Sequence, residues 1–412
     1  MKRILLAIIL SMIMAVAPFN LIHANTPVPD VLPIVTGDFL QGWQFAPFSR
    51  AQIAAHINEL AEAGIRYLII NDSARIENGI VTESYFPTIP PAPNSPWGNN
   101  VVEYVLSAAQ NTDIRVFVGL AYDRTWWQNC LPLNINWYSP RAELGNALAQ
   151  DVYNMFKHRY PDAFYGWYFP HEFFNNKQGQ EWHFANFFNI NRDFLYDLNP
   201  SMPMLISPFF ASDHTSPATT RAQLINFFTH ANFRDGDIYA PQDCVGVGRA
   251  TIAQSVEYFR VIKEARDQVI PGLRLWANNE NFMPDIATTA PLSRFIDQMV
   301  ATNPYVEKHI TFSYSHYFAS LVTGTNSHHQ AYLAYRQSVL DELDLLFGDV
   351  NGDGIINAAD ITLLRRYLAA DDRAAFRQTH PNFNRHNATR HINSALSYCD
   401  VEELRRLLGS AW

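Results

Sequence analysis

Two glutamates, each just past the end of an apolar run, are the residues best suited to acid–base chemistry. Glu172 follows the aromatic run AFYGWYF (163–169), and Glu280 follows the run 273–277, a further 108 residues along the chain. Partial burial of a carboxyl group raises its pKa, so that it can hold a proton at neutral pH. Either glutamate could instead be an ordinary loop residue, solvated or paired with a cation.

A pair of carboxyl groups on one cleft is the arrangement that hydrolyses glycosidic bonds. One group protonates the leaving oxygen, and the other acts as a nucleophile or as a base toward water. A separation of about 5–5.5 Å between the two groups gives retention of configuration, and about 6.5–9.5 Å gives inversion. The chain must therefore fold so that two residues far apart in sequence meet across one cleft.

Apolar runs alternate with amphipathic stretches along the chain, which predicts repeated strand–helix units. Eight such units predict a parallel sheet closed into an α/β (β/α)₈ barrel, the TIM-barrel fold. An open doubly wound sheet is the alternative, but no glycine-rich phosphate loop follows the first strand. The expected strands are 34–40, 67–70, 115–120, 163–169, 204–207, 237–240, 273–277 and 310–313. The expected helices are 49–63, 101–110, 141–158, 182–198, 221–229, 251–268, 291–303 and 327–346.

Barrel enzymes carry their chemistry in the loops after the strands, and here those loops are rich in amide and aromatic side chains. The loops after strands four and seven face each other across a barrel mouth, so Glu172 and Glu280 are expected to meet there. Flat rings and amides suit a polyhydroxylated ligand. The predicted ligand-binding residues are Gln41, Trp43, Trp126, Trp167, Gln242, Asp243, Trp276, Asn278 and Tyr314.

Several of these residues have a second interpretation. Trp43, Trp126, Trp127 and Trp276 could be packing residues as readily as sugar platforms, because cores also absorb aromatic side chains. Asp243 is expected to bind ligand or to support a neighbour rather than to act as an acid.

Four motifs resemble the DUF4434 family of glycosidase-like barrels, which has no assigned substrate. They are GDFLQGW (37–43), GWYFPHE (166–172), APQD (240–243) and LWANNENF (275–282). The resemblance covers about residues 30–345 and implies a fold more firmly than an activity. The placement of the acids also resembles the retaining (β/α)₈ glycosidases, which implies that Glu172 is the acid/base and Glu280 the nucleophile. The match is partial, since His171 stands where those enzymes usually carry asparagine.

Residues 349–360 have the residue types and the spacing of a calcium-binding loop. Oxygen-bearing side chains stand at positions 1, 3, 5, 9 and 12, and glycine at position 6 permits the sharp turn. Ca²⁺ is a hard ion that takes oxygen ligands, so a structural calcium site is expected here, and no cofactor is expected for catalysis. The predicted ligands are Asp349, Asn351, Asp353, the Ile355 carbonyl, Asn357 and Asp360.

The segment after this loop, DITLLRRYL (360–368), is echoed forty residues later by DVEELRRLL (400–408). This duplication resembles a type I dockerin over roughly 348–412 and implies binding to a cohesin domain of a scaffold protein. The second loop lacks the carboxylate at position 1 and the glycine at position 6, so weak calcium binding or none is expected there. A lone calcium brace is the alternative. Ala358, Ala359, Arg365 and Arg366 stand where dockerins contact cohesin.

The N-terminus predicts the compartment. Lys2 and Arg3 precede an apolar run, 4–17, which is typical of a cleaved secretory signal and too short for a comfortable membrane span. An uncleaved anchor is the minor alternative. We therefore expect a signal peptide at 1–24, a barrel domain at 30–347 and a dockerin at 348–412. Cys130 and Cys244 could pair in an oxidising compartment.

The expected function follows from these parts together. A net charge of −9, with no dense basic run beyond the N-terminus, argues against a nucleic-acid partner. The leading hypothesis is a secreted, cellulosome-associated glycoside hydrolase that acts on a polysaccharide, with no membrane span after signal cleavage. A non-catalytic carbohydrate-binding or structural barrel on the same scaffold is the alternative. An esterase or peptidase ranks last, because no nucleophile motif is present.

Overall fold

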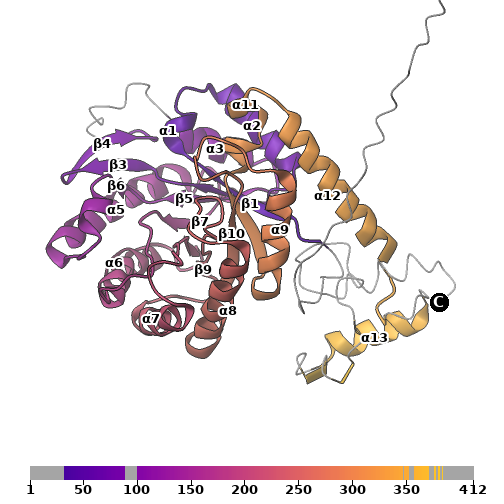
Figure 1. Cartoon of the computed structure of the whole chain (residues 1–412). Coiled ribbons are helices and arrows are strands. Elements are labelled where there is room, and N and C mark those ends of the chain that lie inside the picture. Colours follow the sequence, from indigo (N-terminus) through magenta and orange to yellow (C-terminus); the bar gives the residue numbers. More distant parts are fainter. Residues whose placement is uncertain are drawn as a thin grey trace, which may run out of the picture.

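Eight parallel strands close into a barrel, and helices cover its outer face (Figure 1). The computed structural model describes residues 32–88, 100–346, 348–351, 357–370, 375–376, 379–380 and 383. The order around the barrel is β1-β11-β10-β9-β8-β7-β5-β2, which confirms the predicted (β/α)₈ fold. The strands are β1 (Val35–Leu40), β2 (Tyr67–Ile70), β5 (Arg115–Gly119), β7 (Phe164–Phe169), β8 (Met204–Ile206), β9 (Ile238–Tyr239), β10 (Arg274–Glu280) and β11 (Lys308–Phe312).

The outer helices begin at capping residues that the sequence contains. Ser49 and Thr251 each form a capping box with the glutamine three residues later, at the start of α2 and α8. The remaining members of the layer follow the same strand–helix alternation. The outer helices are α2 (Arg50–Glu62), α3 (Val101–Ala109), α5 (Ile135–Phe156), α6 (Glu181–Leu198), α7 (Pro217–His230), α8 (Ile252–Val269), α9 (Leu292–Thr302) and α12 (Ser327–Leu346).

Two helices begin earlier than predicted. The helix expected from residue 141 begins at Ile135, because Asn134 caps it through the Asn136 N–H and Pro140 is accommodated within it. The helix expected from residue 221 begins at Pro217, where Ser216 accepts the Thr219 N–H. A proline at the first helical position is favoured, since its missing N–H has no partner within the helix.

Short elements that the strand–helix alternation did not predict lie in the loops. A small sheet, in the order β4-β3-β6, stands beside the barrel. Asn78 and Gly79 join its hairpin with positive φ angles, the geometry that an Asn-Gly turn favours. The added elements are α1 (Gly42–Phe45), β3 (Ala74–Glu77), β4 (Ile80–Ser84), β6 (Tyr122–Asp123), α4 (Trp126–Asn129), η1 (Asn303–Tyr305), α10 (Tyr314–Tyr317) and α11 (Ser320–Thr323).

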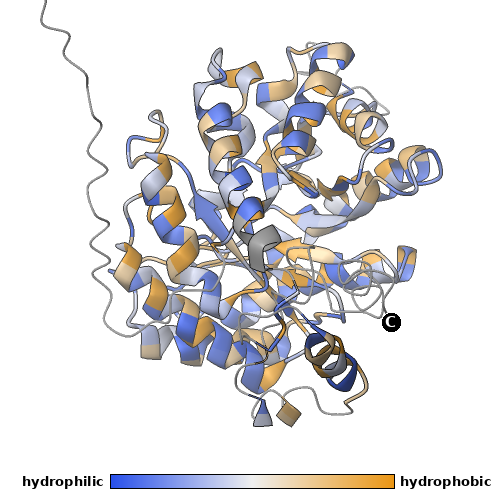
Figure 2. Cartoon of the chain, turned by 90° about the vertical axis from the view of Figure 1, so that its right-hand side faces the viewer, coloured by the Kyte–Doolittle hydropathy of each residue, from blue (hydrophilic) through white to orange (hydrophobic). Residues whose placement is uncertain are grey.

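The core of the barrel domain has two layers. One fills the barrel interior and includes Phe117, Tyr168 and Trp276, and the other lies between the strands and the helices. Figure 2 shows both polar and apolar residues around the outer helices, as expected when one face of each helix packs on the sheet. Cys130 and Cys244 are both buried and free, so the disulfide considered between them is absent.

The C-terminal segment has a small core of its own. Helix α13 (Ala358–Leu368) packs Ile361, Leu364 and Tyr367 against Val350 and Phe383. The predicted signal peptide, the predicted second calcium loop and Cys399 lie outside the described residues. Among the helices that the structure describes, none combines the length and the apolar character needed to span a membrane.

Gly166, in β7, lies where neighbouring residues pack closely against the backbone. A Cβ atom at this position would lie 2.5 Å from the Pro203 carbonyl oxygen and 2.6 Å from the Phe117 ring. Because the backbone oxygen cannot move aside cheaply, Gly166→Ala is expected to lower the free energy of unfolding by about 1–3 kcal/mol in urea titrations.

Gly145→Ala is the matched control for this substitution. Gly145 lies inside α5, and the nearest atom to an added Cβ is 3.7 Å away, an ordinary contact. Alanine is the better helix former by about 0.5–1 kcal/mol, so this variant is expected to be at least as stable as the wild type. Equal stability of the two variants would contradict the packing described at Gly166.

Candidate active site

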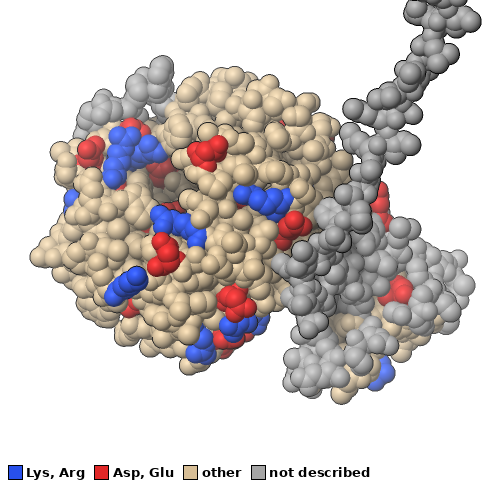
Figure 3. Space-filling model, in the orientation of Figure 1, with Lys and Arg blue, Asp and Glu red and all other residues tan. Residues whose placement is uncertain are grey.

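A cleft with room for about 230 Å³ opens at the carboxyl end of the barrel strands. It brings Glu172 and Glu280 together, as their positions after the fourth and seventh barrel strands predicted. Over the described residues drawn in Figure 3, charged side chains stand in small scattered groups and form no continuous basic surface. The cleft is lined by Trp127, Glu172, Phe209, Gln242, Val247, Arg249, Glu280, Phe282 and Phe312.

Glu172 lies in the loop after β7 and is partly exposed to the cleft. Gln242 Nε2 donates to Glu172 Oε1 over 2.7 Å and also to the Ser207 carbonyl oxygen over 3.1 Å. Burial raises the pKa of Glu172 to about 7, against the opposing effects of the Gln242 hydrogen bond and the Arg249 charge. A carboxyl group in this state can give up a proton and take one back at neutral pH.

Glu280 is the last residue of β10 and is 1% exposed. The sequence predicted it in a loop, but the strand extends three residues beyond its apolar part and pairs Glu280 with Phe312 of β11. The Val247 N–H donates to Glu280 Oε2 over 2.7 Å. Gly246 lies so close that a Cβ atom there would be 2.5 Å from the Glu280 Cβ, so this loop needs glycine.

The electrostatics of Glu280 depend on Asp243. Burial, and after it the charge of Asp243, raise the pKa of Glu280 well above its usual range. Burial also raises the pKa of Asp243, against hydrogen bonds from Gln298 Nε2 (2.6 Å) and Asn279 Nδ2 (2.9 Å). Two buried carboxyl groups that repel each other do not readily ionise together.

Asp243 was predicted to bind ligand or to support a neighbour, and Asn278 to bind ligand; the structure places both behind the surface of the cleft. Asp243 is fully buried behind Glu280, and its oxygens accept four hydrogen bonds from protein donors. Asn278 is 1% exposed, and its Nδ2 donates to Ser207 Oγ over 3.0 Å. Neither residue lines the cleft, so both act on the site only through the residues that they hold.

The rings of four predicted ligand-binding residues are covered by protein, which for Trp126 and Trp276 agrees with the packing alternative. Trp126 packs on His171 and Phe173, with ring centroids 5.2 and 6.2 Å away. Trp167 and Trp276 are buried in the two layers of the barrel core. Tyr314 is buried as well, and its hydroxyl group is hydrogen-bonded to His329 Nδ1.

Trp127 is the tryptophan that lines the cleft, and it is 51% exposed. Its ring centroid lies 6.1 Å from that of Phe174 and 5.9 Å from that of Phe209. Trp126 and Trp127 are neighbours in the single turn α4, so they point in different directions. The sequence named both as candidates, but the choice between them depends on how that turn is oriented.

Other lining residues follow strands or lie in one long loop. Phe282 and Phe312 stand at or just after the ends of β10 and β11, where the rule of strand ends could have found them. Val247 and Arg249 lie farther along the loop after β9, where no pattern marked them. Trp43 is 46% exposed but, like Gln41, is not among the lining residues of the cleft.

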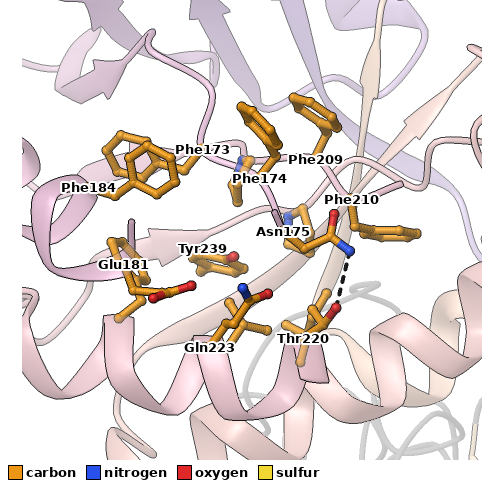
Figure 4. A pocket seen from close by; sticks show the side chains of 15 residues that line it. Phe173, Phe174, Asn175, Glu181, Phe184, Phe209, Phe210, Thr220, Gln223 and Tyr239 are labelled. Carbon is orange, nitrogen blue, oxygen red and sulfur yellow. Dashed lines mark hydrogen bonds between the residues drawn. The ribbon is translucent and has the colours of Figure 1, made fainter. Parts of the chain in front are cut away.

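Asn175 ties the loop that carries Glu172 to the loop after β8. Its Nδ2 donates to the Ala211 carbonyl oxygen (3.2 Å), Thr215 Oγ1 (3.0 Å) and Thr220 Oγ1 (3.2 Å), and its Oδ1 accepts the Ala211 N–H. Figure 4 shows the Asn175–Thr220 bond beside an aromatic-lined cavity of about 40 Å³ behind the cleft. A space of that size is large enough to hold water. This network fixes the backbone on which Glu172 stands.

The comparisons with known proteins agree with this architecture. Residues 35–322 match a domain of unknown function, DUF4434, and residues 347–403 match the type I dockerin domain. The chain belongs to the DUF4434 family. Its C-terminal module is a type I dockerin. No curated protein matches the sequence.

Solved structures with the same barrel include glycoside hydrolases. This DUF4434 chain is 18% identical to a candidate α-L-fucosidase from Bacteroides thetaiotaomicron, with a TM-score of 0.57 over 78% of this chain and 96% of that one. An endo-1,4-β-D-mannanase from Thermotoga petrophila is 10% identical, with a TM-score of 0.46 over 68% and 88%. At 18% identity, the similarity to the candidate fucosidase describes the fold and leaves the activity open.

The described part of the dockerin loop fits a calcium ion. Type I dockerins typically bind calcium, and Asp349, Asn351, Asn357 and Asp360 all carry the oxygen atoms that this ion takes. Asp360 is fully buried and draws the ends of the loop together, because it accepts the N–H groups of Val350, Asn351 and Asn357. Asp353 and Ile355 lie outside the described residues, so the complete ligand set stays a prediction.

The predicted cohesin-contact residues are accessible on α13. Ala359, Arg365 and Arg366 are exposed, and Ala358 is partly exposed. Their contact with cohesin stays a prediction.

Asn175→Ala tests the support of the Glu172 loop. The substitution removes the hydrogen bonds that Asn175 Nδ2 donates and leaves the buried Ala211 N–H without its acceptor, so we expect a loss of about 1–3 kcal/mol in the free energy of unfolding. Asn226→Ala, at an exposed position of α7, is the control and is expected to change stability by less than about 0.5 kcal/mol. A thermal unfolding midpoint unchanged by Asn175→Ala would show that the network does not hold this loop.

Proposed function

We propose that the barrel hydrolyses glycosidic bonds of a polysaccharide and that the dockerin holds the protein on a scaffold. The observation that carries the proposal is the meeting of Glu172 and Glu280 in one cleft at the carboxyl end of the barrel. Two carboxyl groups, one of them able to exchange a proton at neutral pH, are the machinery that this reaction needs. The aromatic side chain of Trp127 offers a sugar ring a flat surface beside them.

In the proposed mechanism Glu172 is the acid/base and Glu280 the nucleophile. Glu172 gives its proton to the glycosidic oxygen while Glu280 attacks the anomeric carbon, which forms a glycosyl-enzyme and releases the leaving sugar. Glu172 then takes a proton from water, and that water displaces Glu280 with net retention. Gln242 supports this exchange, because its hydrogen bond orients Glu172 and favours the ionised form.

The nucleophile must be ionised, and this depends on which member of the Asp243–Glu280 pair holds a proton. We infer that the buried Asp243–Glu280 pair keeps one proton near neutral pH, because both pKa values are raised. With that proton on Asp243, Glu280 is a carboxylate that accepts the Val247 N–H. With the proton on Glu280, the site has no ionised nucleophile, which corresponds to the alternative of a non-catalytic carbohydrate-binding barrel.

The remaining parts of the proposal concern how the protein is secreted and attached to a scaffold. We propose a signal peptide at 1–24, a barrel domain at 30–347 and a dockerin at 348–412, so that the protein is secreted and joins an extracellular cellulosome. Calcium in the first dockerin loop would brace α13, which would present Ala358, Ala359, Arg365 and Arg366 to a cohesin domain.

Replacing each acid tests the hydrolase. Glu172→Gln and Glu280→Gln are each expected to lower the release of reducing sugar from a polysaccharide panel by about 10²–10⁴-fold. Glu143→Gln, at an exposed position of α5, should retain full activity. Activity that persists in both acid variants would refute the assignment of Glu172 and Glu280. For the wild type, NMR of the first-formed product should show retained anomeric configuration.

The pH dependence tests the role of Glu172. An acid must be protonated to act, and Glu172 loses its proton as the pH rises through about 7. The value of kcat/KM is therefore expected to fall above about pH 7, with an alkaline limb that disappears in Glu172→Gln. An alkaline limb that stays in place in the residual activity of this variant would assign the acid to another group.

Calcium-dependent capture tests the dockerin separately. Asp349→Ala removes a charged ligand from the loop and is expected to abolish retention on immobilised cohesin, as chelation with EDTA should do for the wild type. Asp341→Ala, at an exposed position of α12, is the control of equal charge change. Capture of Asp349→Ala at wild-type levels would exclude the proposed calcium site.

A further inference from the structure

Arg249 is the only cationic side chain among the nine described residues that line the cleft. It is exposed and lies in the loop after β9, the same loop that holds Glu280 through Val247. The chemistry proposed above needs two acids and a place for a sugar, and it gives Arg249 no part. The position of this cation beside Glu172 and Glu280 therefore raises the question of which anion it binds.

The backbone and the side chain of Arg249 are both held in place. Its N–H donates to the Cys244 carbonyl oxygen over 3.0 Å, and its own carbonyl oxygen accepts from Ser212 N (3.2 Å) and Ser212 Oγ (2.9 Å). Its guanidinium carbon lies 5.3 Å from the centre of the Phe209 ring. Stacking on an aromatic face orients the planar group while leaving its N–H edge available for a ligand.

No carboxylate of the described residues lies within 4.0 Å of the Arg249 guanidinium. This sets it apart from Arg141 and Arg192, which pair with Asp123 and Asp237 over 2.7 Å. The charge of Arg249 reaches Glu172 and lowers the pKa of that group, but the two side chains do not form an ion pair.

We propose that Arg249 binds an anionic group of the substrate, so that the cleft selects sugar units that carry a carboxylate or a sulfate. This inference rests on the proposed function and names the class of polysaccharide. Guanidinium and carboxylate match as a two-pronged pair, and sulfate offers the same oxygen geometry. A neutral sugar needs no cation, whereas an anionic sugar would otherwise meet only the repulsion of Glu172 and Glu280.

The test measures binding separately from hydrolysis. The full chain carrying Glu172→Gln is titrated calorimetrically with three sets of oligosaccharides: uronic-acid oligomers, the methyl esters of the same oligomers, and sulfated oligomers. Adding Arg249→Ala is expected to weaken binding of an anionic set about ten- to a hundredfold and to leave binding of the methyl esters unchanged. Arg249→Lys should recover part of the affinity, because it keeps the charge but loses the planar fork.

Arg66→Ala, at the opposite end of the barrel next to β2, is the control for loss of one positive charge, and thermal unfolding verifies that each variant is folded. Loss confined to the carboxylated or to the sulfated set supports the proposal and identifies the anion. Equal loss on charged and esterified oligomers overturns it, since Arg249 would then act on the cleft in general. Absence of binding to every anionic set also overturns it.

The two proposals fail in different ways. Arg249-dependent binding of anionic oligosaccharides by a chain that never hydrolyses them would leave this inference standing and remove the hydrolase. Hydrolysis of neutral polysaccharides that is indifferent to Arg249→Ala would do the reverse.

Discussion

The burial of Glu280 against Asp243 is the interaction on which the cleft depends, because two acids can share an apolar surrounding only if enough donors face them. The donors come from three elements: Asn279 in β10, Gln298 in α9, and the backbone of the loop after β9. That loop passes close enough to reach Glu280 only because residue 246 is glycine. The burial of Glu280 therefore depends on the path of the loop after β9, on the length of β10 and on the Gln298 side chain of α9.

On the side of the cleft that carries Glu172, amide side chains hold the loops together through hydrogen bonds. Gln242 joins Glu172 to the Ser207 carbonyl oxygen, so the residues after β7, β8 and β9 are linked by one amide. Asn175 makes a second link between the first two of these loops, behind the stacked rings of Phe174 and Phe209. Amide side chains suit this task, because each offers donors and an acceptor without adding charge to a site that already holds two acids.

The sequence was sufficient to predict the barrel and the meeting of its two acids, since both follow from strand order and from the rule that parallel strands end together. It was less informative where polar residues continue a strand. Three polar residues, 278–280, extend β10. The amide groups of Asn278 and Asn279 donate to Ser207 and Asp243, and these tertiary contacts leave no apolar run in the sequence. The choice between Trp126 and Trp127, and the reach of Arg249, depend on loop conformations set by tertiary contacts. The Asn78–Gly79 hairpin, in contrast, carried a local signal that the strand–helix pattern overlooked.

The two walls of the cleft differ in burial, and this difference bears on how the cleft could bind a substrate. Its acidic wall, formed by Glu280 at the end of β10 and by residues 243–247 of the loop after β9, is largely buried and hydrogen-bonded, so substitutions there are expected to be destabilising. Its other wall is formed by Trp127 of the short helix α4, by Phe209 and by the Arg249 side chain stacked on Phe209, and these three side chains are exposed or partly exposed to solvent. In the proposed function the two acids carry the chemistry, and the more exposed side chains of the cleft, Arg249 among them, set its specificity.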